Sequence, residues 1–224
     1  MTAAVAVVLV AAALLLAACG SHSAPQSGNG KIVAAALGDS ITAGSPGYDP
    51  DPKAAAYLGF GSDVRSQWEY WAGKADPRLE FRNCGVYGER TDQIARRLDE
   101  CAKGAQALIV QGGINDIAQG KSVERAAANL RAMVRRGKAL GLRVALVDVL
   151  PWNNGYPAFD PRIRELNRLI GAIGREERVP VLPFHDTIED PQRPGRMPER
   201  LTDDGDHPNV EGYKLLGERA FRLP

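Results

Sequence analysis

Residues 31–40 read KIVAAALGDS, and this stretch decides the fold class. Its first part, Ile32–Leu37, is a short and almost continuous apolar run, as expected of a strand that is covered on both faces. Four more runs of this kind follow along the chain: Leu79–Asn83, Ala107–Gln111, Val144–Leu150 and Val179–Leu182. The sequence therefore predicts five buried strands.

Segments with the apolar spacing of helices separate these runs. The clearest is Ser122–Leu140, where Ser122 is a suitable N-cap. The others are residues 62–74, Thr91–Lys103, Arg162–Glu177 and Asn209–Phe221. Strands that alternate with helices predict βαβ units and a parallel sheet. We expect an α/β fold, a three-layer α/β/α sandwich around a five-stranded parallel sheet, with the functional site at the carboxyl ends of the strands.

The composition is that of a soluble globular domain. Of the 224 residues, 44% are apolar and 25% are charged, and the formal net charge is +1. This balance gives no electrostatic reason to expect nucleic acid or an anionic membrane surface as a partner. The three His and three Cys residues lack the spacing of metal ligands. We expect no metal and no cofactor, and a monomer.

The N-terminal residues predict a leader that is not part of the fold. The apolar run from Ala3 to Ala18 is shorter than the roughly 20 residues of a membrane span and suits the core of a signal peptide. The small residues before Cys19 resemble a bacterial lipobox, in which that Cys is lipidated. No Lys or Arg precedes the run, which departs from the usual export signal. A cleaved signal with an incidental Cys is therefore the alternative.

These features divide the chain into three parts. Residues 1–19 form the expected signal peptide, the small and polar residues 20–30 form a flexible linker, and residues 31–224 form the folded domain. We expect an exported protein, either anchored by lipid on the outer side of the cytoplasmic membrane or secreted. Outside the cytoplasm Cys84 and Cys101 can form a disulfide, although two buried thiols are equally compatible with their spacing.

Reactive side chains gather where the predicted strands end. The first strand leads into Gly38-Asp39-Ser40, the second into Asn83 and Gly88, and the third into Gly113-Ile114-Asn115-Asp116; Asp204-Gly205-Asp206-His207 lies near the C-terminus. Each group alone has an ordinary explanation as a turn or a helix cap. Together they are more informative, because parallel strands end at one edge of a sheet.

The combined residues make a complete set for acyl transfer. A serine hydroxyl becomes an effective nucleophile when a base takes its proton and a third group orients that base. Asp204 and His207 supply both within four residues. Acyl transfer also needs donors for the developing oxyanion, and the backbone N–H groups of Ser40 and Gly88 and the side-chain amide of Asn115 are the candidates.

In this order, the four groups resemble the four sequence blocks of the SGNH (GDSL-type) hydrolases, and the resemblance extends from Lys31 to the C-terminus. It implies a flavodoxin-like sheet and a serine esterase that acts through an acyl-enzyme. Ser40 would be the nucleophile, His207 the base, Asp204 its orienting acid, and Gly88 and Asn115 the oxyanion donors.

His185 and Asp39 are two further residues near the predicted site whose side chains can ionise. His185 follows the fifth predicted strand and is a rival base, which we rank below His207 because no Asp stands three residues before it. We expect Asp39 to brace the loop of the nucleophile rather than to react.

The substrate is less constrained by the sequence. Tyr48 lies in an expected long loop, residues 45–61, and Trp152 and Tyr156 follow the fourth strand. Aromatic groups here suit a sugar ester, which would make the protein an O-deacetylase of carbohydrates, but short-chain and lipid esters are also compatible. An inactive surface-anchored binding module and an acyltransferase with the same triad are the alternative functions.

Overall fold

The computed structural model describes residues 30–224. The expected signal peptide, Cys19 and the linker up to residue 29 lie outside the described residues. Between residues 30 and 224, no helix combines the length and the apolar character needed to cross a membrane.

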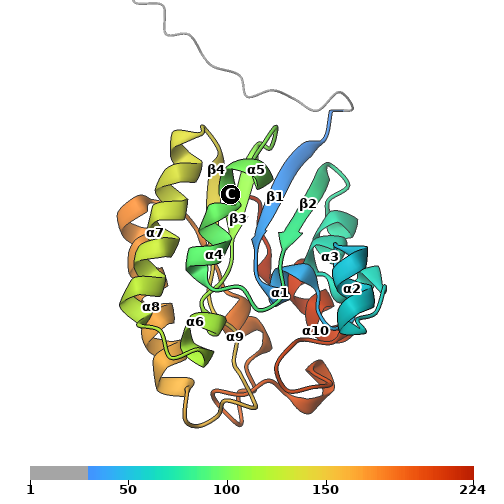
Figure 1. The fold of residues 1–224 in the computed structure, drawn as a ribbon, viewed down its shortest axis with the longest axis vertical. Coiled ribbons are helices and arrows are strands. Elements are labelled where there is room, and N and C mark those ends of the chain that lie inside the picture. Colours follow the sequence, from blue (N-terminus) through green and yellow to red (C-terminus); the bar gives the residue numbers. More distant parts are fainter. Residues whose placement is uncertain (1–29) are drawn as a thin grey trace, which may run out of the picture.

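The centre of the fold is a parallel sheet of five strands in the order β2-β1-β3-β4-β5 (Figure 1). The strands are β1 (Ile32–Gly38), β2 (Leu79–Gly85), β3 (Ala107–Val110), β4 (Arg143–Val147) and β5 (Val181–Leu182). The predicted α/β fold and the predicted strands are confirmed, although β4 ends three residues earlier than expected and β5 is only two residues long.

Helices cover both faces of this sheet (Figure 1). One layer contains α4 (Thr91–Arg96), α5 (Leu98–Cys101), α6 (Ile114–Ala118), α7 (Val123–Ala139) and α8 (Asp160–Glu177). The other contains α1 (Ser40–Ala43), α3 (Trp68–Ala75), α9 (Phe184–Ile188), α10 (Val210–Leu215) and a following π-helical turn, Leu216–Ala220. The structure is therefore the expected three-layer sandwich.

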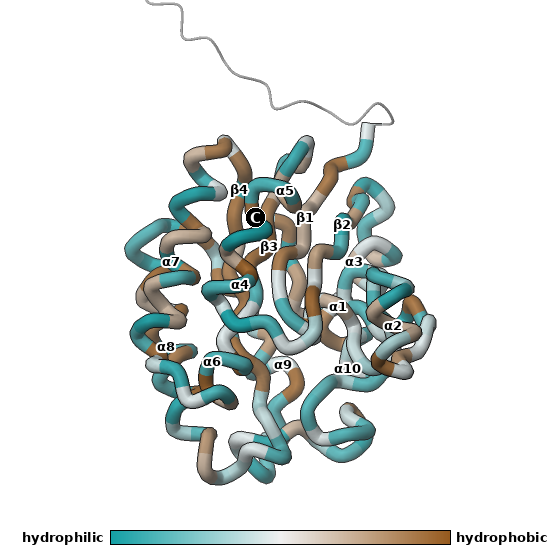
Figure 2. Tube along the Cα trace, in the orientation of Figure 1, coloured by the Kyte–Doolittle hydropathy of each residue, from teal (hydrophilic) through white to brown (hydrophobic). Residues whose placement is uncertain are grey.

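The strands divide their side chains between the two layers. Successive residues of a strand point to opposite faces, so Leu108 and Val110 of β3 pack in the first layer while Ile109 between them packs in the second. Strands β3 and β4 are accordingly brown, or hydrophobic, over most of their length in Figure 2, because their residues are apolar whichever layer they face. This explains why the sequence shows continuous rather than alternating apolar runs.

Two segments differ from the prediction. The expected loop at residues 45–61 contains a helix, α2 (Pro52–Leu58), which Asp51 caps by accepting a hydrogen bond from the Lys53 backbone N–H at 2.9 Å. An Asp followed by Pro is a helix start signal, so this prediction was wrong. The predicted helix Thr91–Lys103 is interrupted at Arg97, whose guanidinium reaches the backbone at the ends of β1 and β2.

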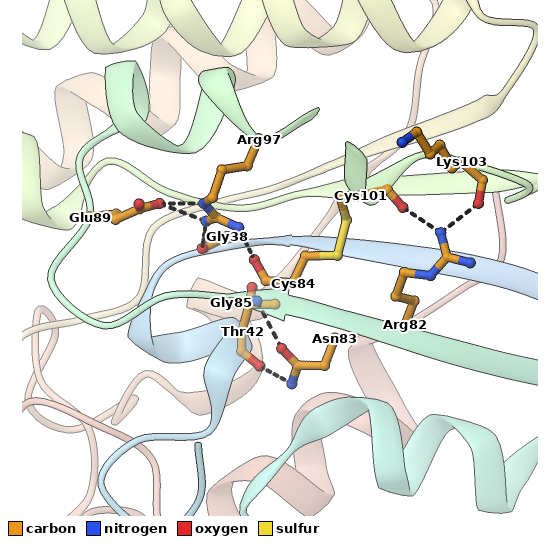
Figure 3. Close-up of a disulfide and its surroundings, with 10 residues drawn as sticks. All are labelled: Gly38, Thr42, Arg82, Asn83, Cys84, Gly85, Glu89, Arg97, Cys101 and Lys103. Carbon is orange, nitrogen blue, oxygen red and sulfur yellow. Dashed lines mark hydrogen bonds and ion pairs between the residues drawn. A yellow bond between two sulfur atoms is a disulfide. The ribbon is translucent and has the colours of Figure 1, made fainter. Parts of the chain in front are cut away.

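Cys84 and Cys101 form a disulfide, so the first of the two alternatives for this pair is correct. The bond joins the end of β2 to the end of α5 (Figure 3).

The strand register brings the predicted blocks to one edge. Gly38 pairs with Gly85, and Leu37 pairs with Val110. The segments that follow β1, β2 and β3 therefore start at the same level of the sheet. In Figure 1 they lie at the lower edge, together with α1, α6 and α9.

Candidate active site

Ser40 is the first residue of α1 and lies directly after the end of β1. Asp39 caps this short helix, with its Oδ1 accepting a hydrogen bond from the Ile41 N–H at 3.0 Å. Burial raises the pKa of Asp39 to about 6, against the lowering effect of that hydrogen bond. Gly38 is required before it, because a Cβ there would collide with the side chains of Thr42 and Gln111. Asp39 thus fixes the turn that presents Ser40.

His207 lies between Ser40 and Asp204. The Ser40 Oγ is 3.0 Å from His207 Nε2, and His207 Nδ1 is 2.7 Å from Asp204 Oδ2. Asp204 Oδ1 also accepts a hydrogen bond from the His207 backbone N–H at 2.7 Å. Burial raises the pKa of Asp204, but the hydrogen bonds from His207 and Asp206 outweigh it and hold that pKa well below its ordinary value. An ionised carboxylate therefore faces the imidazole.

The turn that carries Asp204 and His207 is held by the segment after β4. The Asn154 side chain donates to the Asp204 carbonyl at 2.8 Å, and the Asn153 N–H donates to the Gly205 carbonyl at 3.0 Å. Trp152 Nε1 donates to Asp206 Oδ1 at 2.5 Å. This bracing fixes the position of the acid and the base relative to the sheet.

Gly88 and Asn115 border the same cavity as Ser40 and His207. Gly88 has a φ of +76°, a conformation that glycine adopts without strain. The Asn115 side-chain nitrogen donates to the Glu89 carbonyl at 3.0 Å. A primary amide has two N–H groups, so this bond fixes the orientation of the amide while the second N–H can meet a bound oxygen.

Asp116 binds the first residue of α4, three residues after Gly88, a role that the sequence reasoning did not assign. It is buried, and its two carboxylate oxygens accept hydrogen bonds from the backbone N–H and the hydroxyl of Thr91 at 2.9 and 2.8 Å. Burial raises the pKa of Asp116, while the bonds from Thr91 lower it. The sequence did point to Asp116, because it directly follows Asn115 in the third block.

Gln111 is a second residue that the sequence reasoning missed. It follows β3 directly, and its Oε1 accepts hydrogen bonds from the Asp39 N–H at 3.1 Å and from the Thr42 hydroxyl at 2.9 Å. The end of β3 is thereby joined to both sides of the Ser40 turn. In the sequence, only the position of Gln111 at the end of a predicted strand indicated a role in the site.

These residues border a cavity of about 130 Å³. Its polar lining includes Ser40, Asn115 and His207, and its apolar lining is formed by Ile41, Ile114, Ala118, Val149, Leu150, Pro151 and Trp152, with the Tyr87 ring at its edge. Of the three aromatic residues suggested for substrate binding, Trp152 lines the cavity, whereas Tyr48 and Tyr156 are not among the lining residues.

His185 is not among the residues that line this cavity. It is buried, and its Nδ1 lies 2.7 Å from the Val149 carbonyl, to which it donates as an N–H. Within residues 30–224, His185, Asp186 and Glu189 form the one group with three candidate metal-ligand atoms close together. Glu189 is already paired there with the Arg164 guanidinium at 2.9 Å, which competes with a cation for its carboxylate.

Comparisons with known proteins identify the family of the chain. A family model described as GDSL-like lipase/acylhydrolase matches residues 36–215. None of the curated proteins compared with the sequence matches it. Solved structures similar to the chain include a protein from Desulfitobacterium hafniense DCB-2 described as a putative lipolytic protein of the G-D-S-L family. It is 24% identical with a TM-score of 0.69, over 85% of this chain and 97% of that chain.

Two further structures share the fold. A lipase/acylhydrolase from Enterococcus faecalis is 22% identical with a TM-score of 0.65, over 84% of this chain and 91% of that chain. A variant of an acetyl xylan esterase from Geobacillus stearothermophilus is 20% identical with a TM-score of 0.64, over 85% of this chain and 92% of that chain. The family match covers most of the chain and all four blocks at the sheet edge, so the protein belongs to the GDSL-like lipase/acylhydrolase family and is a carboxylic ester hydrolase.

Proposed function

We propose that the protein hydrolyses short-chain carboxylic esters, with Ser40, His207 and Asp204 as its catalytic triad. The observation that carries this proposal is the continuous chain of hydrogen bonds from the Ser40 hydroxyl through the His207 ring to the Asp204 carboxylate, at the edge of a cavity. The distances of 3.0 and 2.7 Å are within the range for a nucleophile, its base and an orienting acid.

In the first step, the Ser40 oxygen attacks the ester carbonyl carbon and His207 Nε2 takes the hydroxyl proton. Asp204 stabilises the imidazolium that forms and keeps Nδ1 protonated and oriented. The negative charge on the carbonyl oxygen is stabilised by the backbone N–H groups of Ser40 and Gly88 and by the Asn115 amide. His207 then protonates the leaving alcohol, and the acyl group remains on Ser40.

In the second step, water attacks the acyl-enzyme. His207 takes a proton from the water, the same donors stabilise the second oxyanion, and His207 returns the proton to the Ser40 oxygen as the acid leaves. Each donor of this kind contributes roughly 2.7–4 kcal/mol to lowering the barrier.

The form of the cavity supports a small acyl group. A volume of about 130 Å³ is below the ~300–1,000 Å³ of pockets that hold drug-sized ligands. Ile114, Ala118, Val149 and Leu150 give the acyl chain an apolar wall. Tyr87 also lines the cavity and is 46% exposed, so its ring is accessible to the alcohol part.

We also propose that the alcohol part is a carbohydrate, so that the substrate is an acetylated sugar. The exposed Tyr87 ring and the Trp152 ring beside the cavity support this substrate, and one structure with the same fold is described as an acetyl xylan esterase. A panel of acetylated xylo-oligosaccharides, 4-nitrophenyl esters of increasing acyl length and lysophospholipids tests it. Acetyl release from the sugars at a higher kcat/KM than from the lysolipids supports the proposal, and a preference for the lysolipids contradicts it.

The disulfide supports a further proposal, that the protein acts outside the cytoplasm, where such bonds persist. Lipid attachment at Cys19 is testable by metabolic labelling with a palmitate analogue. Wild-type protein should be labelled and Cys19→Ser should not, and an unlabelled wild-type protein would contradict the anchor.

A further inference from the structure

Arg97 connects the ends of two strands through its guanidinium group (Figure 3). One terminal nitrogen, Nη1, donates to the Cys84 carbonyl at 2.7 Å at the end of β2. The other, Nη2, donates to the Gly38 carbonyl at 3.1 Å at the end of β1. Because Gly38 is two residues before Ser40, this contact fixes the backbone from which the nucleophile turn starts.

The same guanidinium binds the carboxylate of Glu89. Arg97 Nε and Nη2 donate to Glu89 Oε2 at 2.9 and 2.6 Å, and the two side chains are only 28% and 18% exposed. Partial burial reduces screening by solvent, so this pair is held more firmly than an ion pair at the open surface. Glu89 is thereby fixed relative to the ends of both strands.

Glu89 occupies a place in the chain that matters for catalysis. It directly follows Gly88, and its own carbonyl accepts the hydrogen bond from the Asn115 amide at 3.0 Å. Both proposed oxyanion donors that lie outside the Ser40 turn are therefore linked to the position of Glu89. Neither Glu89 nor Arg97 is among the residues that line the cavity, so neither can act by touching the substrate there.

The interruption between α4 and α5 explains how Arg97 reaches these groups. Arg97 lies at the junction of the two helices, four residues before Cys101. The disulfide from Cys101 to Cys84 ties this junction to the same strand end that Arg97 binds. Only a guanidinium offers several N–H donors in one plane, so a lysine cannot bind three separate acceptors in this arrangement.

We propose that Arg97 and Glu89 are positioning residues that set the distance between Ser40 and the oxyanion donors Gly88 and Asn115. This inference rests on the proposed triad and oxyanion donors. Since those donors act mainly on the charge that develops in the transition state, displacing them lowers kcat and leaves KM almost unchanged.

Three variants test the proposal: Arg97→Ala, Arg97→Lys and Glu89→Gln. We expect kcat to fall by about 10- to 100-fold in Arg97→Ala, because a misplacement on the order of 1 Å costs about 10²-fold. Arg97→Lys keeps the charge but not the planar donors, so its kcat should remain well below that of the wild type. Glu89→Gln should lower kcat by a smaller factor.

Arg96→Ala is the matched control. Arg96 is the neighbouring residue, its side chain is 70% exposed, and it binds Asp92 on the same helix. Arg96→Ala removes one positive charge from this segment, as Arg97→Ala does. Unlike Arg97, Arg96 does not bind the backbone at the end of β1 or β2. We expect its kcat and KM to equal those of the wild type.

Each rate is divided by the concentration of reactive Ser40, titrated to completion with a fluorophosphonate, and measured well below the unfolding temperature of each variant. This removes any loss that comes from unfolded protein. Affinity for an alkyl boronic acid, which forms a tetrahedral adduct on the serine, gives a second readout. It should weaken in Arg97→Ala by about the same factor as kcat/KM. The double variant Arg97→Ala/Glu89→Gln should lose no more than Arg97→Ala alone, because the two side chains act as one unit.

The outcomes separate the two levels of the account. A wild-type kcat per titrated serine in Arg97→Ala, with Ser40→Ala inactive, overturns the positioning role and leaves the proposed function intact. The positioning role is also overturned if Arg97→Ala has fewer reactive Ser40 sites but a normal kcat per site. A rise in KM at constant kcat overturns it as well. Wild-type enzyme that is not labelled at Ser40 contradicts the proposed function itself.

Discussion

The Ser40 Oγ and the His207 Nε2 lie 3.0 Å apart, although 167 residues separate them along the chain. The sheet accounts for this proximity. Ser40 follows the end of β1 directly, and the turn with His207 is bound to the segment after β4 through Asn153 and Asn154. Both segments lie at the carboxyl edge, where parallel α/β sheets place their sites.

Asp204→Asn should lower kcat by about 10⁴-fold, because the amide no longer holds the correct tautomer of His207 or stabilises its charged form. Stopped assays with 4-nitrophenyl acetate measure this loss. Asp203→Asn is the control, since Asp203 is exposed and its carboxylate accepts a hydrogen bond from the Asn209 side chain at 3.1 Å. Activity of Asp204→Asn within tenfold of the wild type would show that Asp204 does not orient the base.

Trp152→Ala should extend the range of acyl chains that the enzyme accepts. The Trp152 ring lines the cavity and stacks on Phe159, with ring centroids 5.1 Å apart. Removal of this ring enlarges the apolar part of the cavity. The ratio of kcat/KM for hexanoyl and octanoyl esters to that for acetyl esters should therefore be higher in Trp152→Ala than in the wild type.

Trp152→Phe serves as the control for this prediction. It keeps an aromatic ring but lacks the Nε1 donor to Asp206. It should retain the preference for short chains. The same chain-length profile in wild type and Trp152→Ala would exclude Trp152 as a wall of the acyl site.

Replacing both disulfide cysteines by serine should lower the free energy of unfolding by about 3 kcal/mol. The bond closes a loop with a sequence separation of 17 residues, and such a constraint on the unfolded chain has about this magnitude. Urea unfolding of the oxidised wild type and of Cys84→Ser/Cys101→Ser measures the difference. Equal midpoints under oxidising conditions would contradict this contribution.

Glu69→Gln should change how stability depends on pH. Glu69 is buried, neither of its carboxylate oxygens has a hydrogen-bond partner among the described residues, and burial raises its pKa well above the ordinary value. The unfolded chain ionises this group above about pH 4.5 while the folded protein keeps it protonated. Its contribution to stability is therefore complete at low pH and falls as the pH rises toward the folded-state pKa.

The neutral Gln lacks this loss, so the stability difference between Glu69→Gln and the wild type should increase in favour of the variant from pH 5 to pH 8. The slope reaches at most about 1.4 kcal/mol per pH unit. Glu218→Gln, at an exposed site, should show the slope of the wild type. Parallel stability curves for Glu69→Gln and the wild type would mean that Glu69 is ionised in the folded protein.

Much of the fold and the site could be predicted because the signals are local. The runs that became β1 and β3 are apolar on both faces, and each leads directly into a block, so Ser40 and Asn115 could be placed at one edge from sequence alone. Asp204 and His207 were recognisable because a spacing of three residues allows their contact within one turn.

The features that the sequence did not predict depend on contacts between segments that are far apart along the chain. Nothing in the residues around Arg97 indicates that its guanidinium reaches Gly38 and Cys84, since this requires the interruption between α4 and α5 and the pairing of β1 with β2. The isolation of the Glu69 carboxylate likewise arises from packing and has no sequence signature. The start of α2 was missed for a different reason: its Asp-Pro signal lies in a segment rich in Gly and Pro.

The central claim is that Ser40 is the nucleophile, and the turnover of 4-nitrophenyl acetate by Ser40→Ala tests it most directly. We expect kcat/KM to fall by at least about 10³-fold while the variant unfolds at the temperature of the wild type. An unchanged kcat/KM in folded Ser40→Ala would contradict it.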